Sequence, residues 1–177
     1  AMDWSERTAA ILQLWYPGQE SGNALADVLF GDADPGGRLP LTIPVRMEDT
    51  PAFLDVPGED LRIAYSEGLF VGHRWYDARD IAPRFGFGHG LSYARFEYGA
   101  LRIASPRVAA AEPVACEIEI SNGGARPGRE VVQLYAQRCT PGVRRPLRTL
   151  AAFEKIALAP GVRRVVRFAL PPRAFSH

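Results

Sequence analysis

The sequence predicts two fold classes in one chain, an α/β segment followed by an all-β sandwich. Near the N-terminus an apolar run, a glycine turn and a helical pattern follow one another, which is typical of an α/β unit. After Tyr93 the chain changes to short alternating runs about ten residues apart, separated by glycine and proline turns, which is typical of a β-sandwich. The 177 residues, 47% of them hydrophobic, can bury an ordinary core. The 17 glycines and 15 prolines indicate that strands and loops outweigh helix.

The α/β segment begins with an expected strand and helix. The apolar run from Ala9 to Leu14 is stopped by a proline and a glycine, which predicts a buried strand of a mainly parallel sheet. A helix is expected over roughly Asn23 to Phe30, where apolar residues recur at helical spacing. Ser21 or Asn23 would cap its start, and Gly31 would end it.

The middle of the chain holds few regular elements. A brief extended segment is expected from Leu39 to Ile43, followed by an ordered surface loop from Arg46 to Asp60. Residues Ile63 to Tyr76 combine aromatic and aliphatic residues with two glycines, which predicts one or two irregular extended pieces. Residues Asp77 to Gly90 are expected to form another loop.

The second half contains the expected strands of the sandwich. Val114 to Ser121 has the clearest pattern, because apolar residues alternate there with alanine and glutamate, burying one face and wetting the other. The domain boundary is therefore predicted after Tyr93, giving domains of residues 1–93 and 94–177. The other expected strands are Phe96 to Ile103, Glu130 to Gln137, Leu147 to Leu158 and Val162 to Leu170.

Composition argues against several classes of partner. A net charge of +1 gives no field for holding nucleic acid or an anionic membrane, and no apolar run approaches the ~20 residues that a membrane span needs. The chain starts without the pattern of a signal peptide, which leaves cytoplasmic, periplasmic and secreted locations all open.

The chemistry-bearing residues suggest no cofactor or metal. The three histidines His73, His89 and His177 have no partner at zinc-binding spacing, and no phosphate loop is present, so neither is expected. Cys116 and Cys139 match no metal or redox spacing. Both fall in or beside predicted strands, so two buried free thiols are favoured over a disulfide.

Several ordered motifs carry a family resemblance that runs over essentially the whole chain. They are WYPGQESGNALADVLFGD from Trp15, DPGGRLP from Asp34, FGFGHGLSY from Phe85, GREVVQLY from Gly128 and RPLRTLAAFEK from Arg145. The first three resemble the C-terminal half of glycoside hydrolase family 3, the β-glucosidase and β-xylosidase family. The last two are similar to the fibronectin type III-like domain that closes many of its members.

The resemblance implies where this chain stands in such an enzyme. In the family a β/α-barrel domain supplies the nucleophilic aspartate and an α/β-sandwich domain supplies the acid/base glutamate upstream of the first motif. Both catalytic carboxylates are then expected outside this chain, which implies a C-terminal fragment of a retaining β-glycosidase, most simply a β-glucosidase, that is inactive alone. Its partner would be the remainder of the enzyme, in cis or as a separate chain, with a β-glucoside or β-xyloside as substrate.

The resemblance also implies a final hairpin beyond the last residues of this sequence. The immunoglobulin-like sandwich would then lack its last strands and have an open sheet edge, which is a hazard for self-association. A further possibility follows from this open edge: the chain folds only by pairing with another copy or with the rest of the enzyme.

Four residues are candidates for contact with a sugar. Glu20 follows the turn at the end of the predicted parallel strand, where α/β sheets place ligands, although it could simply hydrogen-bond the amides at the helix start. Trp75, Tyr76 and Asp77 resemble a sugar-stacking surface, with rings for the apolar sugar face and a carboxylate for the hydroxyls. The two rings could equally be core at a domain seam. Asp27, Asp32 and Asp34 are interpreted as solvated or turn-capping acids.

A different class of function fits the same sequence. The chain could be a non-catalytic fibronectin type III-like module that binds a carbohydrate or a protein. Retention of glucan by the isolated chain, and its loss on Trp75→Ala substitution, would favour that alternative.

Overall fold

The structure, a computed structural model, describes residues 2–137, 139 and 144–175. The chain divides into two compact units whose segments alternate along the sequence. Unit 1 consists of residues 1–13, 39–89 and 137–149, and unit 2 consists of residues 14–38, 90–136 and 150–177. Each unit is built from pieces that are distant in sequence, so long-range contacts define both.

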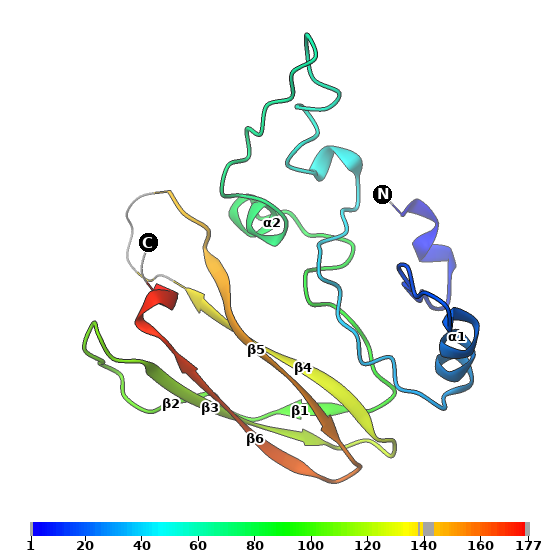
Figure 1. Cartoon of the computed structure of the whole chain (residues 1–177), viewed down its shortest axis with the longest axis vertical. Coiled ribbons are helices and arrows are strands. Elements are labelled where there is room, and N and C mark those ends of the chain that lie inside the picture. Colours follow the sequence, from blue (N-terminus) through cyan, green and yellow to red (C-terminus); the bar gives the residue numbers. More distant parts are fainter. Residues whose placement is uncertain (1, 138, 140–143, 176–177) are drawn as a thin grey trace. The chain divides into compact units, whose positions relative to one another are not determined.

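One sheet of unit 2 is built around the strand β3, Val114–Asn122. On one side it pairs antiparallel with β1, Phe96–Tyr98, and β2, Arg102–Ile103, and on the other side with β6, Arg163–Leu170 (Figure 1). The β3–β6 register runs from Val114 opposite Leu170 to Ser121 opposite Arg163. The predicted alternation is confirmed, because Cys116 and Ile120 are buried while Glu117 and Glu119 pair with arginines of β6 at the surface.

A second sheet completes the β-sandwich. It consists of β4, Gly128–Gln137, and β5, Arg148–Leu158 (Figure 1). One apolar cluster draws side chains from β3, β4, β5 and β6, as expected for two sheets packed face to face. Its buried members are Cys116, Ile120, Val132, Ile156, Leu158, Val166 and Phe168. After β6 a short 3-10 helix, η3, spans Pro172–Phe175.

The helix α1, Ser21–Phe30, also belongs to unit 2 and confirms the predicted helix. Gly31 ends it in the left-handed conformation, with φ 86°, as a glycine allows. The predicted cap is wrong, because Glu20 is the N-cap residue and its side chain makes no capping bond to the backbone. Asn23 instead donates a hydrogen bond to the Glu20 carboxylate at 2.6 Å.

Unit 1 is mostly irregular. It contains two 3-10 helices, η1 at Asp3–Arg7 and η2 at Met47–Asp49, and the helix α2 at His73–Arg79. One isolated β-bridge joins Ile43 to Phe85, which agrees with the extended segment expected near Ile43, and another joins Glu59 to Arg62.

Three further sequence-based expectations are wrong in whole or in part. Residues Ala9 to Leu14 form no strand and are exposed, because a parallel strand needs hydrogen-bonded neighbours and none pairs with this run in the described part of the chain. Residues 73–76 are helical rather than extended, since Gly72, with φ 56°, turns the chain into α2. The expected burial of Cys139 is wrong, because this residue is exposed. The expected free thiols and the burial of Cys116 are confirmed, and this burial raises the pKa of the Cys116 thiol.

Two searches of the described residues bear on membranes and metals. None of their helices is long and apolar enough to cross a bilayer. No group of three or more histidine, cysteine, aspartate or glutamate side chains lies close enough among them to hold a metal ion.

Candidate functional site

The predicted aromatic site lies on α2 in unit 1. Trp75 is half-buried, and its indole Nε1 donates a hydrogen bond to the backbone oxygen of Asp49 at 3.0 Å. The Arg79 guanidinium lies 4.4 Å from the centre of the Trp75 ring, a cation–π distance. Tyr76 is buried, and burial together with the nearby Asp49 charge raises the pKa of its hydroxyl. The Trp75 ring therefore has partners within unit 1, and the Tyr76 ring is buried.

Asp77 is held by a bidentate ion pair. Arg148, at the start of β5, donates from Nε and Nη2 to the two carboxylate oxygens of Asp77, each at 2.8 Å. The Asp77 side chain is 18% exposed and that of Arg148 is 52% exposed. The fork geometry makes this a strong example of a partly exposed ion pair. The carboxylate predicted to meet sugar hydroxyls is thus engaged by an arginine.

His73, at the first position of α2, stacks on Phe87 with ring centroids 4.8 Å apart. Burial lowers the pKa of His73, and the positive charges of Arg74 and Arg148 lower it further, while Asp77 opposes them. The imidazole is therefore kept neutral more readily than a solvated histidine.

Glu20 belongs to unit 2 and is exposed at the start of α1. The structure thus brings Trp75, Tyr76 and Asp77 together on one helix, whereas Glu20 belongs to the other compact unit. The assignment of these four residues to sugar contact stays a prediction.

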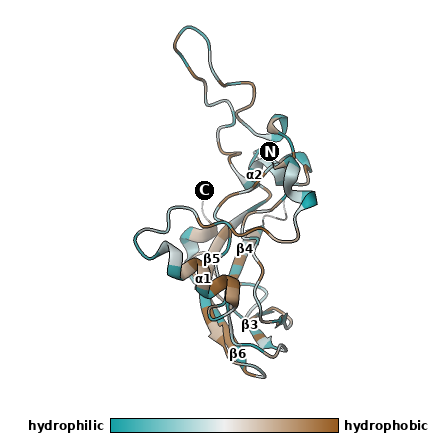
Figure 2. Cartoon of the chain, turned by 90° about the vertical axis from the view of Figure 1, so that its right-hand side faces the viewer, coloured by the Kyte–Doolittle hydropathy of each residue, from teal (hydrophilic) through white to brown (hydrophobic). Residues whose placement is uncertain are grey.

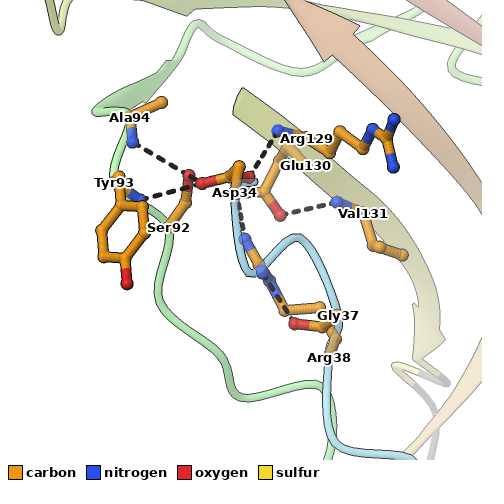
Figure 3. Close-up of polar contacts among 9 residues, drawn as sticks. All are labelled: Asp34, Gly37, Arg38, Ser92, Tyr93, Ala94, Arg129, Glu130 and Val131. Carbon is orange, nitrogen blue, oxygen red and sulfur yellow. Dashed lines mark hydrogen bonds and ion pairs between the residues drawn. The ribbon is translucent and has the colours of Figure 1, made fainter. Parts of the chain in front are cut away.

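A polar cluster that sequence reasoning missed lies in unit 2 around Asp34 (Figure 3). The Asp34 carboxylate accepts three hydrogen bonds, from the Ser92 hydroxyl at 2.6 Å, the Tyr93 amide at 2.9 Å and the Arg129 amide at 2.8 Å. The interpretation of Asp34 as a solvated or turn-capping acid is therefore wrong. The neighbouring glycines of DPGGRLP were the available signal, since glycine permits a close backbone approach.

A buried ion pair lies beside Asp34. Arg38 donates to the Glu130 carboxylate at 2.8 Å, and the two side chains are only 9% and 11% exposed. Arg38 also donates to the Gly37 oxygen at 2.8 Å, and Glu130 accepts from the Val131 amide at 2.7 Å (Figure 3). Partial burial and the Glu130 charge raise the pKa of Tyr98 to about 12, with Arg38 opposing them. The extra hydrogen bonds satisfy groups that burial would otherwise penalise.

The two packed antiparallel sheets of the described residues define the class of fold, a β-sandwich that is accompanied by a mostly irregular unit 1. Residues 1–93 match the Glycosyl hydrolase family 3 C-terminal domain, and residues 130–177 match the Fibronectin type III-like domain. The chain belongs to glycoside hydrolase family 3, as the sequence motifs predicted.

Curated relatives extend this similarity over almost the whole chain. "Thermostable beta-glucosidase B" of Acetivibrio thermocellus is 43% identical over 176 residues, which are 99% of this chain and 23% of the relative. A "Beta-glucosidase" of Rhizobium radiobacter is 44% identical over 180 residues, 99% of this chain and 22% of the relative. The chain thus spans less than a quarter of the length of these two relatives.

Solved structures agree with the family assignment. β-Glucosidase 3B from Thermotoga neapolitana, in complex with glucose, superposes with a TM-score of 0.91 at 35% identity, covering 99% of this chain and 24% of that one. The β-glucosidase from Kluyveromyces marxianus, also in complex with glucose, gives 0.86 at 41% identity, covering 95% of this chain and 20% of that one. The predicted fold class, an α/β segment followed by a sandwich, is confirmed.

Proposed function

We propose that this chain is the C-terminal part of a retaining β-glucosidase that hydrolyses terminal, non-reducing β-D-glucosyl residues, with β-xylosides as a second substrate class. The observation that carries the proposal is similarity along 99% of the chain to a β-glucosidase at 43% identity. Glucose in two of the similar solved structures supports a glucoside substrate.

The proposed role is that of scaffold and site wall. A retaining glycosidase needs two carboxylates about 5 to 5.5 Å apart on either side of the scissile bond, one as nucleophile and one as acid/base. The family resemblance supports the proposal that both belong to the part of the enzyme upstream of this chain. The chain is therefore inert by itself, and it acts by shaping the site that the upstream carboxylates use.

The proposed partner is the remainder of the enzyme, which makes up the larger part of each relative. Exposed apolar residues support such a partner. Three of them lie in the run Ala9 to Leu14, which forms no strand: Ile11, Leu12 and Leu14. Two more, Leu29 and Phe30, are exposed at the C-terminal end of α1, which is brown in Figure 2. Burying such side chains against a second surface stabilises a complex through the hydrophobic effect.

The unit 1 loop between η2 and α2 adds further apolar surface. It is unusually rich in exposed large side chains for a soluble surface, and Leu54 and Leu61 are almost fully accessible. The other exposed apolar residues of this loop are Phe53, Val56, Ile63, Tyr65, Leu69 and Val71. We assign this loop to the surface that the upstream part covers.

Within this proposal, the domain boundary follows Tyr93, and Glu20, Trp75, Tyr76 and Asp77 contribute to the wall of the glucoside site. Trp75→Ala is the sharpest variant for this assignment, because it removes a ring without removing a charge. In the complete enzyme it is expected to raise KM for an aryl-β-glucoside more than it lowers kcat.

An activity assay tests the proposal. The chain alone is expected to release no product from an aryl-β-glucoside above background, and the same chain joined to its upstream coding sequence is expected to turn the substrate over. Turnover by the chain alone would contradict its inertness. Absence of activity in the complete, folded enzyme towards aryl-β-glucosides and aryl-β-xylosides would contradict the proposed function.

A further inference from the structure

α1 lacks most of what keeps a short helix folded. It has ten residues, none of them buried, and its N-cap makes no side-chain bond to the backbone. Isolated helices of fewer than about 12 to 15 residues are marginal in water, so α1 depends on tertiary contacts. Those contacts are found at its C-terminal end, among residues of the sandwich unit.

Two side chains of unit 2 satisfy carbonyl groups at that end of α1. The Tyr93 hydroxyl donates to the Val28 oxygen at 2.7 Å, and Arg126 donates to the Gly31 oxygen. The Arg126 guanidinium also lies 5.3 Å from the centre of the Tyr93 ring. The last carbonyl groups of a helix have no partner within it and carry negative partial charge, so a hydroxyl and a cation are suitable partners.

Asp34 joins the turn after α1 to the same part of the sandwich. Its three bonds reach Ser92 and Tyr93 in the segment before β1 and Arg129 in β4, which are 58 to 95 residues away in sequence (Figure 3). One carboxylate therefore fixes three chain segments at once. Since Tyr93 holds both Asp34 and Val28, loss of the Asp34 bonds also affects the contact with α1.

Glycines at the same place allow the segments to come together. A Cβ atom added at Gly36 would lie 2.6 Å from the Arg129 Cβ, and one added at Gly128 would lie 2.5 Å from the Ala94 Cβ. Both distances are shorter than carbon atoms tolerate, so these contacts require glycine. The close approach is an observation independent of the hydrogen bonds, and it points to the same junction.

We propose that Asp34 is a positioning residue, through which the β-sandwich holds α1 and the loop Trp15–Glu20 that leads into it. Its consequence for the enzyme, that the sandwich shapes the glucoside site from a distance through this loop, rests on the function proposed above. Asp34 itself touches no reacting atom in this proposal.

Amide hydrogen exchange on the chain tests the holding of α1. Asp34→Ala is expected to speed exchange of the α1 amides by about tenfold or more, because it removes three bonds to one carboxylate, while β3 and β6 stay protected. Asp34→Asn should give a smaller increase, since its amide oxygen still accepts from Ser92 and Tyr93 but its NH₂ group cannot accept from Arg129. Asp32→Ala, at an exposed acid of the same turn, is the matched control and should leave exchange unchanged.

Two outcomes overturn the holding of α1. One is wild-type exchange of α1 in Asp34→Ala with β3 and β6 still protected. The other outcome applies if Asp34→Ala unfolds the chain altogether. The proposal is then overturned if two milder variants both leave α1 exchange unchanged. These are Asp34→Asn and Tyr93→Phe, of which the second removes only the bond to Val28. An increase confined to α1 in Asp34→Asn supports the proposal, whereas an increase in Tyr93→Phe alone would overturn the role of Asp34, because that variant keeps every Asp34 bond.

Kinetics of the complete enzyme test the consequence for the site. Asp34→Asn is expected to raise KM for an aryl-β-glucoside severalfold with a smaller change in kcat, in preparations of wild-type thermal stability. Unchanged KM and kcat together with faster α1 exchange would overturn the effect on the site. If the wild-type enzyme has no glycosidase activity, the proposed function fails, while the exchange result for Asp34 stands.

Discussion

The β-sandwich and the exposed apolar run Ala9 to Leu14 show how the same kind of residue gives opposite results. Both are rich in aliphatic side chains, yet Ile120 and Val166 in the sandwich are almost fully buried, whereas Ile11 and Leu12 are more than a third exposed. The strand β3 has hydrogen-bonded neighbours on both sides, but nothing pairs with the run among the residues that the structure describes. Apolar character makes a strand possible, and a neighbouring strand makes it stable.

The largest expected effect comes from the core of the sandwich. Ile120→Ala should lower the free energy of unfolding by about 2 to 5 kcal/mol, because it leaves a cavity at a site with 0% exposure. Urea denaturation followed by circular dichroism measures this change. Leu54→Ala, at a side chain that is 92% exposed, is the control, and it should stay within about 0.5 kcal/mol of wild type. Equal losses of unfolding free energy for the two substitutions would contradict the difference in burial between the sandwich core and the exposed residues.

A smaller effect is expected at the ion pair of α2. Asp77→Asn should cost about 1 kcal/mol of unfolding free energy, since it weakens a bidentate pair whose arginine is half exposed to solvent. Arg148→Lys should cost less, because it keeps the charge and loses only the fork. Thermal denaturation at low and high salt measures the stability change of both variants. A loss of stability that is insensitive to salt would contradict an electrostatic origin.

A pH-dependent effect is expected from His73. Burial lowers its pKa in the folded chain below 6.5, so the unfolded chain binds the proton more tightly. The contribution of His73 to stability is therefore complete above pH 6.5 and falls as the pH is lowered through the folded pKa. The urea midpoint of the wild type should drop more between pH 7.5 and 5.5 than that of His73→Phe, which keeps a ring against Phe87 but does not titrate. Parallel curves for the two proteins would contradict this assignment.

The smallest effect on stability is expected in the exposed run. Ile11→Ser with Leu12→Ser should leave the free energy of unfolding within about 0.5 kcal/mol, since neither side chain is buried in this chain. The same double variant should lower self-association, measured by light scattering over a concentration series, because it removes apolar surface. Unchanged self-association would show that the run Ala9 to Leu14 is not part of a surface through which the chain associates.

Local patterns were sufficient to predict β3 to β6 and α1, but they wrongly predicted a strand from Ala9 to Leu14. Period-two alternation and flanking turns located β3 to within one residue, and Gly31 marked the end of α1. α2 was missed because its seven residues are too few to display a period, and the two glycines before it favoured an irregular segment. The glycines of DPGGRLP signalled a close backbone approach near Asp34, but the partners of its carboxylate could not be predicted, because they are 58 to 95 residues away and no local spacing relates them.

The candidate site shows a similar division. The sequence placed Trp75, Tyr76 and Asp77 next to one another, and the structure keeps them on one helix. It gave no sign of Arg148, which comes from 71 residues away to bind Asp77. The sequence was therefore sufficient to predict which residue types lie next to one another on this segment. The partners of each side chain could be identified only in the folded chain.

The alternation of the two compact units along the sequence limits how this enzyme family could be recombined. The chain passes from one unit to the other after residues 13, 38, 89, 136 and 149. A chimera with a single crossover at any of these points still joins segments of different parentage within at least one unit. Shuffled glycosidases should therefore remain foldable when residues 14–38 are inherited together with the strands β1 to β6, even though all of these strands lie more than fifty residues further along the chain.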